Sequence, residues 1–252
     1  MDVLRRILLP AISLICVRAA PAAVALDDFG GSLALTSNDM FHGLSQTCGD
    51  PAAQADLHYR SSGGKSSAEA FAGAWGSAGL GQSACGKARE VNFYAGYSFL
   101  TAADSSASFT YTHYGYPGGA YVIGRLAGRR YDYDALEAQW AWQDRVFLTA
   151  AWTPNALGYR SFSVTQNRSA GSYGIQVHQP LARGFSLSAG VGYDEIADPF
   201  GTGYGFWNAG LGYGLGAWQF EAGYFGTADR ARRLFGSYVA GSQASISAVW
   251  RF

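Results

Sequence analysis

The feature that most constrains this chain is a set of short segments in which apolar and small polar residues alternate. In residues 90–99, for example, Val91, Phe93 and Tyr97 alternate with polar or small residues, and residues 54–61, 184–193 and 218–224 follow the same pattern. A period of two is that of a β-strand with one apolar face. Several of these segments are about ten residues long, which suits a strand that crosses a membrane at a tilt.

The composition indicates which solvent the apolar face meets. Charged residues make up 14% of the chain and aromatic residues 15%, and Gly accounts for 34 of 252 residues, whereas a soluble domain has roughly 25% charged residues. A soluble lipocalin-like barrel or β-sandwich would carry many Lys and Glu opposite its core, but this chain has two Lys, at positions 65 and 87. No segment shows a helical apolar period. We therefore predict an all-β fold, a single closed antiparallel transmembrane β-barrel, because only closure satisfies a sheet backbone in lipid.

The alternation, extended to weaker segments, predicts about twelve strands. Connections after even-numbered strands are short and those after odd-numbered strands are long, which is the pattern of periplasmic turns and extracellular loops in outer-membrane barrels. An additional strand pair within residues 159–167 would give fourteen strands instead. The expected strands cover residues 31–43, 50–62, 67–77, 89–99, 105–116, 131–143, 145–155, 170–180, 184–193, 203–215, 217–226 and 242–252.

The N-terminus predicts export. Arg5 and Arg6 precede an apolar stretch that runs to Val17, and Ala23-Val24-Ala25 forms an A-x-A cleavage site. We expect residues 1–25 to be a cleaved signal peptide and residues 26–252 to be the barrel. Cleavage removes three Arg and one Asp, so that 18 basic and 18 acidic residues become 15 and 17. This balance argues against a nucleic-acid partner.

The C-terminus ends on an aromatic residue that continues an apolar row. Ala244, Ile246, Ala248, Trp250 and Phe252 share one parity in the last expected strand. Trp250 and Phe252 resemble the C-terminal signal by which the barrel assembly machinery recognises its substrates. The same parity predicts that these side chains face lipid.

The opposite parity defines the candidate lumen. Twelve strands fall between the filled barrels of about eight strands and porins of 16–18 strands, so we expect a narrow, partly plugged lumen. Both signs of charge are present, and the pattern therefore does not indicate which ions the lumen would prefer. We expect Arg251 to find its counter-charge near Gln219 and Glu221 on the neighbouring strand. The predicted pore-lining residues are Asp56, His58, Arg60, Glu90, Asn92, Glu137, Gln139, Gln176, His178, Gln219, Glu221 and Arg251.

Two cysteines remain after cleavage, in an oxidising compartment. Cys48 falls in the first long loop and Cys85 in the second, and both loops are expected on the extracellular side. We predict a Cys48–Cys85 disulfide that ties these loops together over the barrel mouth. Free thiols or intermolecular pairing are the alternatives.

Part of the sequence resembles a known family. Residues 33–47 (LALTSNDMFHGLSQT), followed by Asp50-Pro-Ala52, are similar to the opening of TorF-type putative porins of proteobacteria, and residues 71–77, 94–97 and 114–118 match that family in the same order. His42 and Cys48 depart from the family pattern. The resemblance implies an outer-membrane β-barrel with a presumed pore, and it implies no catalytic motif and no substrate.

The expected function is passive diffusion of small hydrophilic solutes through the outer membrane of a Gram-negative bacterium, without enzymatic activity, cofactor or metal. The alternatives are a non-conducting structural or surface-interaction barrel and, less favoured, a barrel hydrolase that uses His113, Asp132 and Asp134 at the extracellular rim. The expected partners are outer-membrane lipid, lipopolysaccharide, the assembly machinery and small solutes. The Arg-rich loops either contact lipopolysaccharide phosphates or are solvated loop charge. Their arginines are Arg125, Arg129 and Arg130 in the third long loop and Arg230, Arg232 and Arg233 in the sixth.

Overall fold

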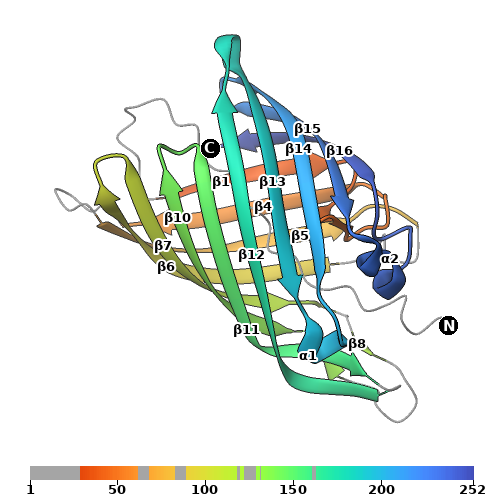
Figure 1. Ribbon diagram of the computed structural model, residues 1–252. Helices are drawn as coiled ribbons and strands as arrows, with labels where there is room; N and C mark the ends of the chain where they lie inside the picture. Colours follow the sequence, from red (N-terminus) through yellow and green to blue (C-terminus); the bar gives the residue numbers. More distant parts are fainter. Residues whose placement is uncertain are drawn as a thin grey trace.

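The computed structural model of the protein describes residues 29–61, 68–82, 89–117, 120–121, 129–130, 132–160 and 163–252. Twelve antiparallel strands close into one barrel (Figure 1). Closure occurs at β1, where Ser32 lies opposite Asp56 of β4 and opposite Arg251 of β16. The strands are β1 (Phe29–Thr36), β4 (Ala52–Arg60), β5 (Ala68–Gly79), β6 (Arg89–Ala102), β7 (Ser105–Gly115), β10 (Tyr133–Trp142), β11 (Val146–Arg160), β12 (Ser163–Pro180), β13 (Phe185–Glu195), β14 (Tyr204–Leu215), β15 (Trp218–Thr227) and β16 (Gln243–Arg251). The predicted fold class and strand count are confirmed.

Smaller elements occupy the longer connections. Two short strand pairs are formed by β2 (Met40–Phe41) with β3 (Leu44–Ser45) and by β8 (Ala120–Tyr121) with β9 (Arg129–Arg130). The helices α1 (Ala197–Phe200) and α2 (Asp229–Phe235) lie at the opposite end of the barrel from the C-terminus (Figure 1). A 3₁₀ turn spans Ala182–Gly184. None of the helices in the described part of the chain is long and apolar enough to cross a membrane.

The outer face of the barrel is apolar and exposed, as the parity predicted. Leu57 is 56% exposed and Val191 is 60% exposed, and their neighbours along each strand face inward. In the last strand Ile246 and Trp250 face outward, and Phe252 continues their row. A belt of this kind on a soluble protein would bind other apolar surfaces, so it fits a hydrocarbon surrounding.

Strand β5 carries its aromatic residues on the inside. Ala70 and Ala72 are exposed on the outer face, whereas Phe71 and Trp75 share the inner face with Glu69. Glycine on the neighbouring strand makes room for this arrangement, because a Cβ at Gly96 would lie 2.4 Å from the Phe71 ring. The aromatic side chains of this strand therefore narrow the lumen.

The segment 156–169 is neither a loop nor an additional strand pair. Strands β11 and β12 remain paired as far as Arg160 and Ser163, and the pairing shifts register between Thr153 and Ala156. Pro154 lies in this shift and has no N–H to donate to the ladder, which is a common cause of a bulge. The long hairpin rules out the fourteen-strand alternative and packs against α1.

Candidate functional site in the barrel lumen

The first long connection folds into the barrel. Residues 37–51 are called the inner loop below, and they leave β1 after Thr36. The sequence had instead predicted a strand that continues to residue 43 and is followed by a surface loop. Within the inner loop Asn38, Phe41 and Leu44 are buried. The chain turns at His42 and Gly43, with φ of 43° and 76°. Polar residues at 37–39 and the His-Gly pair are the local signals that end the strand.

Asn38 fixes the inner loop to the barrel wall. Its Nδ2 donates to Gln243 Oε1 at 2.8 Å, and its Oδ1 accepts from Ser45 Oγ at 2.6 Å and from Thr47 Oγ1 at 3.4 Å. The Asn38 carbonyl accepts from Ser245 Oγ at 2.7 Å. One buried side chain thus connects both halves of the inner loop to β16.

Asp39 makes a second attachment, to β5. Ser77 Oγ donates to Asp39 Oδ2 at 2.6 Å, and Asp39 N donates to Thr47 Oγ1 at 3.2 Å. Burial raises the pKa of the Asp39 carboxyl above its ordinary value, and hydrogen bonds from Ser77 and Gln54 act in the opposite direction. The attachment to β5 is therefore sensitive to the protonation state of Asp39.

A packed apolar cluster, called the cap below, holds the inner loop at the end of the barrel that carries α1 and α2. Leu44 forms an isolated antiparallel bridge with Ala240, and Ser45 N donates to Val239 O at 2.8 Å. The inner loop, the connection that carries α1 and the connection that carries α2 are thus joined in one small core. The cap consists of Leu44, Ile196, Tyr204, Ala231, Phe235, Val239 and Ala240.

His42 lies beneath the cap between two aromatic rings. Its imidazole stacks on Phe41 at 3.7 Å and on Phe206 at 4.3 Å between ring centroids. His42 Nδ1 lies 2.7 Å from Asp194 Oδ1, an ion-pair contact whose angles are not those of an aligned hydrogen bond. A protonated His42 is therefore balanced locally by Asp194.

Tyrosines fill the opposite side of the lumen at the same end. Tyr114 and Tyr133 are buried and stack at 4.4 Å, and Tyr116 lies next to Tyr133. Glu90 and Asn92 are buried nearby on β6, and Asn92 Nδ2 donates to Glu90 Oε1 at 2.7 Å. The inner loop and these tyrosines together pack much of the loop-bearing half of the lumen.

The half of the lumen toward the short turns is more open. Asp56 and His58 are each 19% exposed and Arg60 is 35% exposed, whereas Asp194 is 6% exposed. His58 Nδ1 contacts Asp56 Oδ1 at 2.5 Å, and Tyr94 Oη donates to Asp56 Oδ2 at 2.7 Å. Arg60 pairs with Glu69 at 2.8 Å. Water therefore reaches the charged wall formed by β4–β6.

All the predicted pore-lining residues lie on the inner face, opposite the exposed apolar row, and whether solutes pass them stays a prediction. One expected contact is absent. Gln219 donates to Glu221, while within the described ranges Arg251 forms no ion pair with Glu221. The Arg251 backbone N–H donates to Ala217 O at 2.9 Å, and Ala217 directly precedes β15.

The rim residues considered for a hydrolase lie mostly on the outer surface. His113 Nδ1 contacts Asp134 Oδ1 at 2.8 Å, and Tyr111 Oη and Asn155 Nδ2 both donate to the same carboxylate at 2.7 Å. Tyr111 is 45% exposed on the outer face, so this polar cluster faces the lipid side of the barrel. Asp132 instead accepts from the Tyr116 backbone N–H. The structure thus brings His113 and Asp134 together but not inside a cleft.

Three predictions fall wholly or partly outside the described residues. The signal peptide (residues 1–25) lies there, and so does Cys85, so that the cleavage and the Cys48–Cys85 bridge stay predictions. Arg125 also lies there. In α2, Arg232 pairs with Asp229, which is consistent with solvated loop charge at that position.

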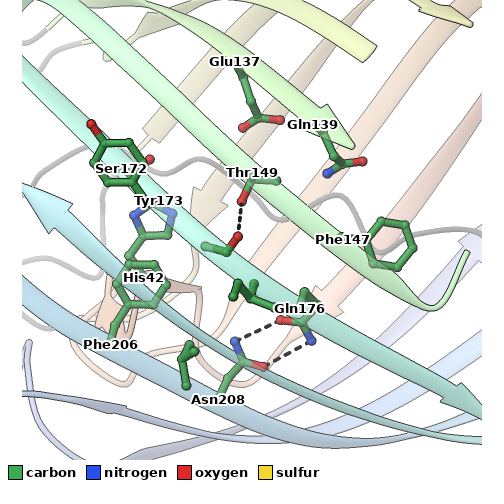
Figure 2. A pocket seen from close by; sticks show the side chains of 13 residues that line it. His42, Glu137, Gln139, Phe147, Thr149, Ser172, Tyr173, Gln176, Phe206 and Asn208 are labelled. Carbon is green, nitrogen blue, oxygen red and sulfur yellow. Dashed lines mark hydrogen bonds between the residues drawn. The ribbon is translucent and has the colours of Figure 1, made fainter. Parts of the chain in front are cut away.

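A pocket remains between the inner loop and the barrel wall, and its lining combines apolar surface with several polar side chains (Figure 2). The space left for water is about 40 Å³, where one water needs roughly 10–15 Å³. Gln176 and Asn208 exchange two long hydrogen bonds of 3.4 Å at its floor. The side chains that line it include His42, Glu137, Gln139, Phe147, Thr149, Gln176, Phe206 and Asn208. Sequence parity had identified Glu137, Gln139 and Gln176 as inward-facing but gave no sign that His42 joins them.

Comparison with solved structures supports the fold. The COG4313 outer membrane channel from Pseudomonas putida F1 is similar over 93% of this chain and 100% of its own, with 10% identity and a TM-score of 0.56. A membrane protein from work on in-meso crystallization is similar over 89% of this chain and 83% of its own, with 8% identity and a TM-score of 0.58. A KdgM porin overlaps less well, over 88% and 99%, with 7% identity and a TM-score of 0.48.

No curated protein sequence matches this chain significantly. A family described as bacterial proteins of unknown function, Gcw_chp, matches residues 20–252. Since the match covers the whole barrel, the chain belongs to the Gcw_chp family.

Proposed function

We propose that this protein is a channel of the bacterial outer membrane for small hydrophilic solutes, with a lumen that the inner loop closes at the extracellular mouth. The observation that carries the proposal is the contrast between the two faces of the wall. Leu57 and Val191 expose apolar surface outward, while Asp56, His58 and Arg60 keep contact with water inside. Lipid outside and water inside is the arrangement of a transmembrane pore.

Export through a cleaved signal peptide, assembly through the terminal Trp250 and Phe252, and contact with lipopolysaccharide belong to this proposal. The resemblance to TorF-type putative porins supports it, as does the similar fold of the COG4313 outer membrane channel. The absence of enzymatic activity is part of the same proposal. His113 and Asp134 lie on the lipid side, away from the lumen that solutes would enter.

In this proposal the inner loop obstructs the lumen, so that conduction requires it to move. The cap holds the loop in place by packing it against α2 and the connection that follows α2. A loop held mainly by side-chain hydrogen bonds and one small core can leave without unfolding the barrel, whose strands are held by continuous backbone ladders. We therefore describe the resting protein as a closed channel.

A non-conducting surface barrel is the second candidate, and the cap is the observation that favours it. Liposome swelling separates the two. Liposomes that contain the refolded protein should swell in isosmotic arabinose faster than protein-free liposomes, and the rate should fall for larger saccharides. Swelling equal to that of protein-free liposomes at every solute size would favour the sealed barrel.

A further inference from the structure

The lumen pocket contains a carboxylate, Glu137, that interacts electrostatically with His42 of the same pocket. Within the described part of the chain, the Glu137 side chain makes no hydrogen bond and no ion pair, although it is partly buried on the inner face of β10. In Figure 2 it points into the space that Gln139, Thr149 and Gln176 border. A partly buried carboxylate that accepts no hydrogen bond is costly, and a ligand that donates to it would lower this cost.

Two carboxyl groups and one imidazole are the ionisable side chains in and directly behind the pocket lining. His42 and Glu137 are the charged residues among its described lining, and Asp194 lies behind His42 at 2.7 Å. If His42 is protonated, Asp194 balances it and Glu137 remains. If His42 is neutral, Asp194 and Glu137 are both uncompensated. With both carboxyls ionised, the pocket is therefore negative in either state of His42 and attracts positive charge.

The remaining lining suits a small cation. Thr149 Oγ1 donates to Gly174 O at 3.4 Å and keeps its lone pairs for a ligand. The Gln176–Asn208 amide pair is held at the long limit of hydrogen bonding, so that either carbonyl oxygen can turn toward the pocket. Phe206 lines the same space with its ring stacked on His42. The space for about three or four waters limits the ligand to a small ion.

We propose that this pocket binds a small monovalent cation, an alkali ion or a primary ammonium group, with Glu137 as its counter-charge. The inference rests on the proposed channel function. In that channel, the pocket beneath the inner loop would be the site that selects among charged solutes. It predicts that solutes carrying an ammonium group pass in preference to anions. The binding itself does not require conduction and is measured separately.

The test is saturation-transfer NMR between the refolded barrel in detergent and methylammonium. Glu137→Gln keeps the size of the side chain and removes its charge, and Asp144→Asn removes a charge from an exposed turn as the matched control. Unchanged heat-modifiable gel migration verifies that each variant folds. Glu137→Gln should weaken methylammonium binding by about tenfold, the size expected for the loss of one charged hydrogen bond, and Asp144→Asn should not.

Equal binding to the wild type and Glu137→Gln, or equal binding of methylammonium and neutral methanol, overturns the proposal. Displacement by KCl supports a site shared with alkali ions, and persistence in KCl supports one for ammonium groups. Planar-bilayer recording of the same samples separates the two hypotheses. Binding without conductance rejects the channel and keeps the site, whereas conductance without Glu137-dependent binding keeps the channel and rejects the site.

Discussion

Asn38→Ala should release the inner loop without unfolding the barrel. The substitution removes the bonds from Asn38 Nδ2 to Gln243 and from Ser45 Oγ to Asn38 Oδ1, together with the weaker one from Thr47. Ser45 Oγ still accepts from Gly49 N, and Gln243 Nε2 still donates to Val239 O. Two groups, Gln243 Oε1 and the Ser45 hydroxyl proton, are left without a partner.

The magnitude follows from these two orphaned groups. Each buried polar group without a partner costs about 1–3 kcal/mol, and partial access to water places the total near 2–4 kcal/mol. Because about 1.4 kcal/mol corresponds to a factor of ten, the population of the released loop should rise roughly 30- to 700-fold. The ladders of the barrel wall do not involve the Asn38 side chain and should keep their stability.

Hydrogen exchange read by mass spectrometry measures this population directly. Peptides that cover residues 38–49 should exchange faster by that factor, while peptides from β13 and β14 should not change. Asn208→Ala is the matched control, because its bonds to Gln176 are 3.4 Å long and should contribute less than about 1 kcal/mol. Exchange in the inner loop of Asn38→Ala within about fivefold of the wild type would refute the reasoning.

Three further predictions follow from other parts of the structure. Since burial raises the Asp39 pKa, the closed inner loop is most stable below the ordinary pKa of 3.8 and loses stability as the pH rises through the pKa of the folded state. Hydrogen exchange in the inner loop, corrected for intrinsic rates, should therefore be slower at pH 4 than at pH 7. Asp39→Asn should abolish this difference. Asp134→Ala removes the acceptor shared by Tyr111 and His113 on the outer face. It should lower the unfolding free energy by about 1–3 kcal/mol in urea titrations. An unchanged urea midpoint of unfolding would argue that the cluster does not stabilise the barrel. Non-reducing peptide mapping should recover Cys48 linked to Cys85, and alkylation of both thiols without reductant would exclude that bridge.

The barrel could be predicted from the sequence because lipid imposes a period of two on every strand. Most side chains that face hydrocarbon must be apolar, so parity alone located the twelve strands and placed Ile246 and Trp250 outward. Strand β5 shows the limit of this rule. Its outward Ala70 and Ala72 are weak signals, and the inward place of Phe71 depends on Gly96 of another strand.

The inner loop could not be predicted in the same way, because its place depends on contacts remote in sequence. Leu44 pairs with Ala240, and Asn38 binds Gln243, at the opposite end of the chain. Inside a lumen neither face of a segment meets lipid, so no period marks it. The Glu137 pocket was missed for the same reason, since His42 reaches it only when the inner loop folds inward.

The central claim, that the inner loop closes the channel, is tested most directly by locking it in place. Two thiols are placed at the antiparallel bridge by Leu44→Cys and Ala240→Cys. The same chain carries Cys48→Ser and Cys85→Ser, so that no other thiol competes. Across such a bridge the Cα atoms lie about 4.5–5.5 Å apart, which suits a disulfide. In planar bilayers the oxidised protein should stay closed, and dithiothreitol should restore single-channel openings. Equal conductance before and after reduction, with the cross-link verified by mass spectrometry, would show that solutes do not depend on movement of the inner loop.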